Sequence, residues 1–335
     1  MLDERWSDDV EAIGDALRGL LDGECSPETV RTAEARENGR DLALEKQLDE
    51  FGLGALEGDP DLFARIAFEL GRALAPTAHV ETMPVQALLA RADTAVGFDG
   101  LVPAGVGSVA LLRGDSVVIA PLKGTPRRTA AGDLVVAPLP LAGNAGEVVG
   151  DLALVDRLRR YLALVESARL TGAAQALLRY GVNYVRDREQ FGRSIATYQG
   201  VSHRLSRAAA EADAAELLVR KAAFTATGAA GGDGAPPAPF AIMARAKAVE
   251  AARFVATNVH QVFGGNGFAM EYDVQLYSRR IRNWSGRGVR TGSQLADLGR
   301  MVLDAPRRDA IAGLWHYEQG ITVPRWAREA DAVNG

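Results

Sequence analysis

The chain has 335 residues, a formal net charge of -5, 47% hydrophobic residues and 24% charged residues. This is the composition of an ordinary soluble protein, and its weakly acidic balance gives no bias toward nucleic acid. The start, MLDERWSDDVEAIGDALRGLL, is acidic and amphipathic, unlike a signal peptide, and no run of about 18 apolar residues could span a membrane. We therefore expect a cytoplasmic protein without a nucleic-acid or membrane partner. Cys25 is the single cysteine, which excludes an internal disulfide and a thiolate metal cluster within the chain, so no metal site is predicted.

Helical periodicity predicts a small helical domain over residues 1–83. The stretches VEAIGDALRGLL and DLFARIAFELGRALAP carry apolar residues at helical spacing, and Pro76 ends the second one. Residues 84–150 instead hold β-branched runs cut by turn residues, as in SVALLRGDSVVIA, where residues 113–115 lie at the reversal of a hairpin. We expect a reduced middle β-domain there.

Helical periodicity returns in residues 151–335. Three stretches of more than 20 residues, at 155–188, 196–227 and 240–263, predict the long helices of a four-helix bundle. Small residues such as Gly172 and its alanine neighbours would let the helix axes approach closely. Helices, then strands, then a bundle make an α+β protein with segregated parts.

The stretch VRDREQFGRSIATYQ presents a cation, an aromatic ring and an amide around a helix break. Arg188 lies three residues before Phe191 and eleven before Gln199. This combination suits a ligand with a phosphate, a flat ring system and a base edge, because an arginine fork can bind two phosphate oxygens at once. A plain helix end with solvated charges is an alternative interpretation.

A second stretch, HQVFGGNGFAMEYDVQLYSRRIRNW, has three glycines in four positions directly after a long helix. One glycine is enough to end a helix, whereas Gly264, Gly265 and Gly267 together leave backbone bare enough for a phosphate to contact its amides. The sequence alone leaves a phosphate seat and a simple turn both open.

In this order and at this separation, the two stretches resemble the C-terminal domain of the acyl-CoA dehydrogenases over about residues 155–300. That family reads R-x-x-F-G, a glutamine seven residues after this glycine, and later Q-x-x-G-G-x-G-[FY] before an acidic-aromatic pair. The residues that match are Arg188, Phe191, Gly192, Gln199, Gln261, Gly264, Gly265, Gly267, Phe268, Glu271 and Tyr272.

The resemblance implies an acyl-CoA dehydrogenase fold and a flavin adenine dinucleotide (FAD) site. In the family, the bundles of two subunits pack together, one subunit holding the flavin ring and the other the adenosine end. By resemblance, Arg188 and the amides of Gly264 and Gly265 would neutralise the pyrophosphate. Phe191 and Gln199 would line the dinucleotide, and Gln261 would lie beside the phosphates.

Two departures from the family pattern fall in the other half of that site. Residues 84–150 lack the family's glycine-serine-aspartate acyl-CoA loop and its tryptophan-threonine flavin strand, and they contain no tryptophan. The family also removes the substrate α-proton with a glutamate, whose counterpart here is Arg290, and no Asp or Glu occurs from Arg279 through Leu295. Because arginine stays protonated, it cannot accept that proton.

Some relatives carry the base on the first bundle helix, where Glu166 lies about one turn from the matching position. Glu166 is therefore a weak candidate for the base, and an ion-pair partner for Arg169 or Arg160 on the helix surface is the alternative. His203 and His260 have no acid at triad spacing and are interpreted as packed or exposed histidines. No residue of this chain is assigned as catalytic with certainty.

A mixed oligomer reconciles a dinucleotide-holding half with a missing base. The chain resembles a short subunit of the actinobacterial steroid-degrading acyl-CoA dehydrogenases, which are heterotetramers of unequal chains acting on CoA-linked sterol side chains. A homologous full-length subunit would then supply the β-domain and glutamate of an acyl-CoA site. A self-sufficient enzyme using Glu166, or a scaffold subunit that binds no flavin, are the alternatives. The tail after Ala305 extends past the last recognisable family segment and is assigned no role.

Overall fold

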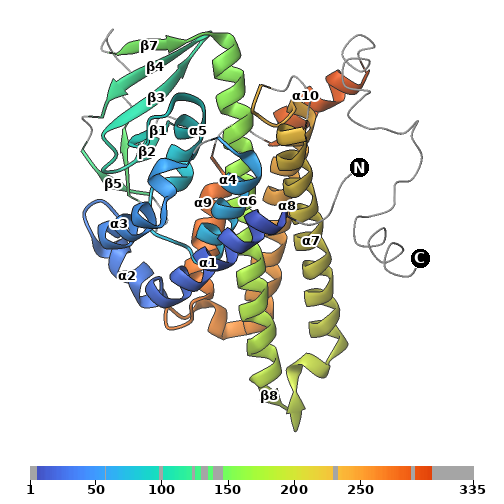
Figure 1. The fold of residues 1–335 in the computed structure, drawn as a ribbon. Coiled ribbons are helices and arrows are strands. Elements are labelled where there is room, and N and C mark those ends of the chain that lie inside the picture. Colours follow the sequence, from blue (N-terminus) through green and yellow to red (C-terminus); the bar gives the residue numbers. More distant parts are fainter. Residues whose placement is uncertain are drawn as a thin grey trace, which may run out of the picture.

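The computed structural model describes residues 6–56, 58–97, 101–122, 125–129, 135–138, 146–228, 233–287 and 291–303. In Figure 1 the 36-residue helix α6 (Leu152–Asp187) runs through the molecule, with the N-terminal helices and the sheets along one side and the other long helices along the opposite side. The predicted α+β class, with its segregated helical and strand parts, is confirmed. Among the described helices, none combines the length and hydropathy required to cross a bilayer.

The N-terminal part is built from capped amphipathic helices. Its elements are α1 (Asp8–Glu24), α2 (Pro27–Ala35), α3 (Leu42–Phe51), the short 3-10 helix η1 (Leu53–Ala55), α4 (Pro60–Arg72) and α5 (His79–Leu89). Ser7, Ser26, Asp41 and Asp59 precede four of these helices, and each side chain accepts a backbone N–H of the first turn. Such caps satisfy donors that have no partner inside the helix.

The predicted boundary between helices and strands lies too early in the chain. Pro84 falls inside α5, and the first strand begins only at Thr94. Proline removes one helical hydrogen bond, but Val80 to Gln86 are all buried, so tertiary packing outweighs this local cost.

The strand region forms two small sheets. Its strands are β1 (Thr94–Val96), β2 (Leu101–Pro103), β3 (Ser108–Arg113), β4 (Ser116–Pro121), β5 (Arg127–Arg128), β6 (Val135–Pro138) and β7 (Glu147–Gly150). One sheet has the order β1-β3-β4-β7 and the other β2-β6-β5. The predicted hairpin is confirmed, because Arg113 pairs with Ser116 across a turn in which Gly114 adopts a φ of 56°.

The bundle contains the three long helices predicted from periodicity. They are α6 (Leu152–Asp187), α7 (Gln199–Gly228) and α8 (Ala238–Phe263). The elements that connect or follow them are β8 (Glu189–Gln190), β9 (Arg193–Ser194), the 3-10 helices η2 (Ile195–Thr197) and η3 (Gly264–Phe268), α9 (Val274–Ser285) and α10 (Thr291–Leu303).

Glycines bring α4 and α6 into backbone contact, as the small residues of the bundle predicted. A Cβ atom added at Gly172 would lie 2.0 Å from the carbonyl oxygen of Phe68, and one at Gly71 would lie 2.0 Å from that of Arg169. Both distances are far shorter than van der Waals contact. Only glycine therefore fits at this crossing.

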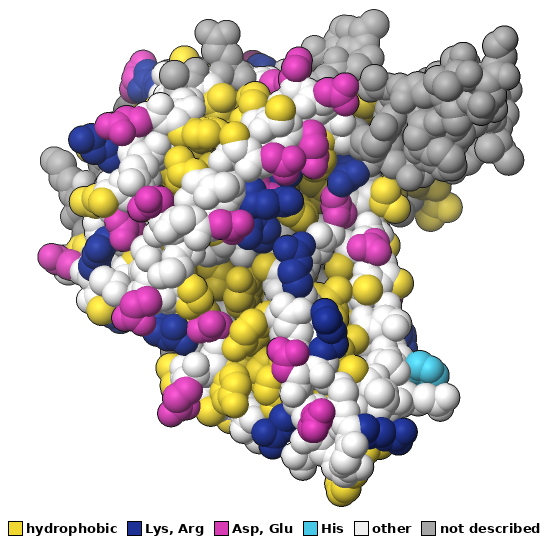
Figure 2. All heavy atoms as spheres, turned by 60° about the horizontal axis from the view of Figure 1, so that its bottom comes forward, with side chains coloured by type: hydrophobic (Ala, Val, Ile, Leu, Met, Phe, Trp, Pro, Cys, Tyr) yellow, Lys and Arg dark blue, Asp and Glu magenta, His cyan; other side chains and the backbone are white. Residues whose placement is uncertain are grey.

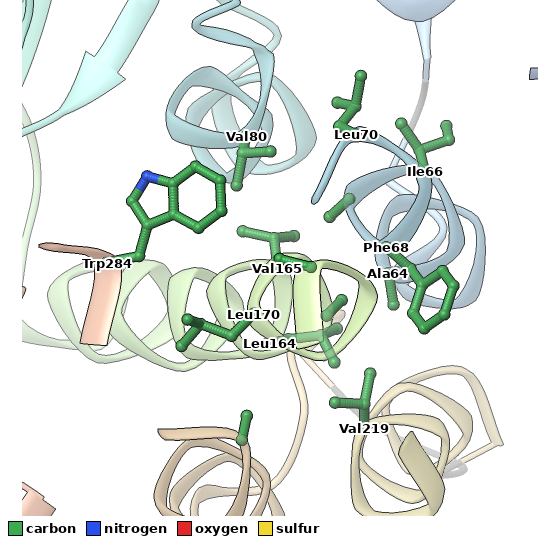
Figure 3. Close-up of a cluster of buried hydrophobic side chains, with 14 of the residues drawn as sticks. Ala64, Ile66, Phe68, Leu70, Val80, Leu164, Val165, Leu170, Val219 and Trp284 are labelled. Atoms are coloured by element: carbon green, nitrogen blue, oxygen red, sulfur yellow. The ribbon is translucent and has the colours of Figure 1, made fainter. Parts of the chain in front are cut away.

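The main hydrophobic core surrounds the middle of α6. Figure 3 shows Leu164, Val165 and Leu170 of α6 among side chains of α4, α5, α7 and α9. Trp284 of α9 covers the end of this core nearest α5, where Val80 lies. Because helices from the N-terminal part and the bundle share one core, α6 fixes the two parts against each other.

Candidate functional site

A short hairpin joins α6 to α7 at the far end of the bundle (Figure 1). Strands β8 and β9 pair across Phe191 and Gly192, which have φ values of 55° and 79°. Positive φ at both central residues is typical of the tight hairpin turn, and it is unusual for phenylalanine. The Phe191 side chain is 93% exposed, so this strained turn holds an aromatic ring out from the protein.

Side-chain contacts hold this hairpin against the ends of both helices. Ser194 Oγ donates to the carbonyl of Val185 at 2.9 Å, and Tyr198 Oη donates to the carbonyl of Gln190 at 3.2 Å. The guanidinium of Arg193 lies 4.2 Å from the centre of the Tyr198 ring. These contacts give the tip of the β8–β9 hairpin a defined conformation.

An aromatic stack places the glycine turn beside the end of α6. Tyr184, in the last turn of α6, stacks on Phe263, the last residue of α8, with ring centroids 3.8 Å apart. Asn266 Nδ2 donates to Tyr184 Oη at 2.9 Å and to Tyr272 Oη at 3.3 Å. These contacts fix the course of residues 264–268 relative to the α6 terminus.

The six residues predicted to contact the dinucleotide gather at this end of the molecule and are all exposed. They are Arg188, Phe191, Gln199, Gln261, Gly264 and Gly265. Arg188 is the C-terminal cap of α6 and Gly264 that of α8, so the Tyr184–Phe263 stack holds their backbones close together. In Figure 2 this end is turned toward the viewer, with basic, acidic and hydrophobic side chains interspersed on it.

The backbone of the glycine turn is open to a phosphate, but one of its amides is already hydrogen-bonded. A Cβ atom at Gly264 or Gly265 would meet nothing within 4 Å, so the backbone there is open to an approaching ligand. The Gly264 amide, however, donates to the Gln261 carbonyl and is not left for a phosphate. Gly267 is buried, where a Cβ atom would lie 3.0 Å from the His260 carbonyl oxygen.

The electrostatics of this end depend on Arg188. Helices α6 and α8 both finish here, and the negative ends of their dipoles disfavour an anion. Within the described part of the chain, the Arg188 guanidinium makes no hydrogen bond or ion pair. Together with the N-terminus of α7 at Gln199, it provides the positive charge that a diphosphate requires.

Glu166 lies elsewhere, in a buried cluster of charges between α5, α6 and α9. Arg169 donates to Glu166 and, at 2.8 Å, to Glu81, which also accepts from Arg287 at 2.7 Å. Glu166 is 2% exposed, and the Arg169 guanidinium lies 4.4 Å from the Trp284 ring centre. Arg169 is one of the two partners expected for Glu166, but the expected location on the helix surface is wrong, because both side chains are buried in the core.

The cluster lowers the pKa of two of its members for different reasons. Burial alone would raise the pKa of Glu81, but Arg169 and Arg287 outweigh it and lower that pKa. Burial lowers the pKa of the Arg245 guanidinium, which donates to the carbonyls of Trp284 and Arg287. These buried charges were missed from the sequence, although single charged residues inside apolar stretches such as HVETMPVQALL were a usable signal.

The remaining sequence-based assignments lie outside these clusters. Arg290 and the tail after Ala305 fall outside the described residues. His203 is exposed, and burial lowers the pKa of the half-buried His260. Cys25 is a buried thiol whose pKa is raised to about 12 by burial.

Two sequence comparisons identify relatives of the chain. Residues 163–285 match the family model of the acyl-CoA dehydrogenase C-terminal domain. The chain is 27% identical to acyl-CoA dehydrogenase IpdE2 of Mycolicibacterium smegmatis, over 82% of this chain and 92% of the relative. It is 33% identical to acyl-CoA dehydrogenase FadE34 of Mycobacterium tuberculosis over 55% of this chain, which spans only 26% of that longer relative.

Solved structures share the fold at low sequence identity. The ChsE4-ChsE5 complex from Mycobacterium tuberculosis matches with a TM-score of 0.77 and 17% identity, over 90% of this chain and 99% of the other. The Tcur3481-Tcur3483 steroid acyl-CoA dehydrogenase matches with a TM-score of 0.75 and 18% identity, over the same shares. Residues 163–285 therefore match the acyl-CoA dehydrogenase C-terminal domain, and over most of its length the chain is similar to mycobacterial acyl-CoA dehydrogenases.

Proposed function

We propose that this chain is the subunit of a heteromeric FAD-dependent acyl-CoA dehydrogenase that lacks the catalytic base. It completes the FAD site of a homologous full-length subunit, which carries the flavin-ring half and the glutamate. The observation that carries the proposal is the exposed end of the bundle, which holds an exposed aromatic ring, an open glycine turn and an arginine without a partner among the described residues.

The residues of this chain would act on the dinucleotide and not on the substrate. Arg188 would pair with the pyrophosphate, with the backbone at Gly265 and the side chain of Gln261 beside it. Phe191 and Gln199 would line the rest of the dinucleotide. When bound, FAD supplies the acceptor for the hydride that leaves the substrate β-carbon.

The substrate class is proposed from the relatives. One structural neighbour is described as a steroid acyl-CoA dehydrogenase and another as a two-protein complex. A steroid side-chain CoA ester, dehydrogenated between its α- and β-carbons, is therefore the substrate class that we propose for the complex. The assembly that fits best is a heterotetramer of two unequal chains, since a two-fold bundle contact keeps its geometry when the two partners differ.

A self-sufficient enzyme that uses Glu166 as base is the less favoured alternative. Its carboxylate is 2% exposed and bound by Arg169, so it would have to lose an ion pair before it could accept a proton. A scaffold subunit without flavin contacts is also less favoured, because a scaffold has no use for an exposed Phe191 in a strained turn.

The proposal is tested by co-expressing the chain with a full-length homologue and measuring bound flavin by its visible absorption. Arg188→Ala should weaken flavin binding to the complex at least about tenfold, because it removes a charge-assisted contact to phosphate. The matched control is Arg186→Ala, which removes an exposed arginine two residues earlier and should leave flavin occupancy unchanged.

Two results would contradict the proposal. Full flavin occupancy in the Arg188→Ala complex would support the scaffold interpretation. Flavin binding together with dehydrogenation of the CoA ester by the chain alone would support the self-sufficient enzyme.

A further inference from the structure

Five arginines line a small recess where the N-terminal helices meet the bundle. Arg18 of α1, Arg65 and Arg72 of α4, Arg179 of α6 and Arg220 of α7 surround a volume of about 80 Å³. This recess is distinct from the hairpin end of the bundle that carries Arg188. Basic side chains gather in the middle of the face that Figure 2 draws.

One buried carboxylate neutralises part of this positive charge. Glu69 is completely buried and accepts hydrogen bonds from Arg18, Arg65 and Arg72. Burial alone would raise the Glu69 pKa, but the three guanidinium groups outweigh it and lower that pKa. Glu69 therefore stays ionised and contributes one negative charge against three arginines.

The other carboxylates near these arginines are more exposed than Glu69. Glu216 pairs with Arg220, and Glu11, the only other acid in the lining, is half exposed and lies 3.3 Å from Arg65. Asp15 and Asp22 also pair with these arginines, but their side chains are 59% and 60% exposed, so water and salt screen them. Formally, five carboxylates thus face five arginines, but three of the carboxylates are about half or more exposed, and within the described residues none of the five pairs with Arg179.

Arg179 is the side chain left for a ligand. It is exposed at the mouth of the recess, and within the described part of the chain it makes no hydrogen bond or ion pair. The other guanidinium groups are held in place: Arg65 passes so close to Gly14 that a Cβ atom there would lie 2.4 Å from its Nε, and Arg220 lies 5.3 Å from the Trp6 ring centre. Four of the five arginines are therefore held in place before a ligand binds, and Arg179 is the exception.

We propose that this recess binds a phosphate group, with Arg179 closing over it. Guanidinium forks match the oxygens of a tetrahedral oxyanion, and several of them on rigid helices favour a doubly charged ion. At roughly 30 Å³ for each water molecule, the recess has room for a few waters or one such group. The inference is independent of the proposed FAD site, because none of the recess residues takes part in it.

The test is calorimetric titration of the full chain with inorganic phosphate and, separately, with AMP, at an ionic strength held constant with chloride. We expect one saturable site for phosphate, weakened at least about tenfold by Arg179→Gln, which loses a charge-assisted contact. Arg159→Gln is the matched control, since Arg159 is exposed on the same helix and lies outside the recess. Thermal unfolding without ligand verifies that both variants fold.

The two ligands separate the possible sources of the phosphate. Equal affinity for both would indicate the free ion, and tighter binding of AMP, also weakened by Arg179→Gln, would indicate a phosphate ester whose base packs near Trp6 or Phe68. Absence of saturable phosphate binding, or equal effects of Arg179→Gln and Arg159→Gln, would overturn the proposal.

Discussion

Glu166 and Arg169 show how burial decides the role of a charged residue. Their ion pair lies one turn apart on α6 and is almost inaccessible to water. Removing one charge of such a pair leaves the other buried and uncompensated, which is more costly than never having had the pair. The carboxylate is accordingly interpreted as structural.

The Glu166→Gln variant tests this role. We expect it to lower the free energy of unfolding by about 1–3 kcal/mol, since the hydrogen bond to Arg169 loses its negative charge. Dehydrogenation by the complex, expressed per bound flavin, should not change. Urea unfolding and turnover measure the two effects, with Glu250→Gln on the exposed face of α8 as a neutral control. Loss of turnover at full flavin occupancy would instead make Glu166 the base.

At the level of single residues, the sequence alone pointed to some candidate positions and not to others. Arg188 and Gln199 could be found because their spacing forms a motif, and the structure places both at one end of the bundle. Glu69 and Arg179 could not, because their significance depends on neighbours from four different helices. The spacing of residues along the chain does not show which side chains of different helices will be in contact.

The crossing of α4 and α6 depends on two glycines with no space for a side chain. Gly172→Ala should lower the free energy of unfolding by about 1–3 kcal/mol or more, because the helices must move apart to admit the methyl group. Urea denaturation provides the measurement.

A second glycine variant separates packing from helix propensity. Gly19, on the exposed face of α1, has nothing within 4 Å of an added Cβ atom. Gly19→Ala should therefore raise the free energy of unfolding by about 0.5–1 kcal/mol. If both alanine variants had the same effect, the close crossing would not be important for stability.

Helices with a clear period were predictable as elements, and those governed by packing were not. The three long helices begin and end within a few residues of the predicted spans. Helix α5 was not predicted as an element, and the expected helical domain ended inside it at residue 83, because the burial that carries this helix through Pro84 is a tertiary effect.

Ion pairs that span separate parts of the chain should make the whole molecule sensitive to acid. The carboxyl groups of Asp41, Asp49, Glu69, Glu81 and Asp233 all have pKa values lowered by arginine, histidine or backbone partners. A lowered folded-state pKa contributes stability that is present above the unfolded-state value and lost as the pH falls through the folded-state value. The free energy of unfolding should therefore fall steeply below about pH 4.

The pKa of Asp61 is raised and not lowered, so its effect on the pH dependence of stability is opposite and it serves as a control. Burial raises its pKa to about 6, so its contribution favours folding at low pH and is lost as the pH rises through 6. Asp61→Asn should raise stability at pH 7 relative to the parent chain, and Glu69→Gln should reduce the loss in acid. Urea unfolding from pH 7 to pH 3 measures both, and a stability independent of pH over this range would contradict the assignment.

Helix α6 gives the two ends of the protein a mechanical connection. At 1.5 Å per residue its 36 residues extend about 54 Å without a break, from the sheet that contains β4 and β7 to the β8–β9 hairpin. A stiff rod of this kind cannot bend sharply in the middle, and the backbone contact with α4 prevents it from sliding. If a neighbouring subunit tilted the hairpin, the sheet at the opposite end of α6 would therefore be displaced.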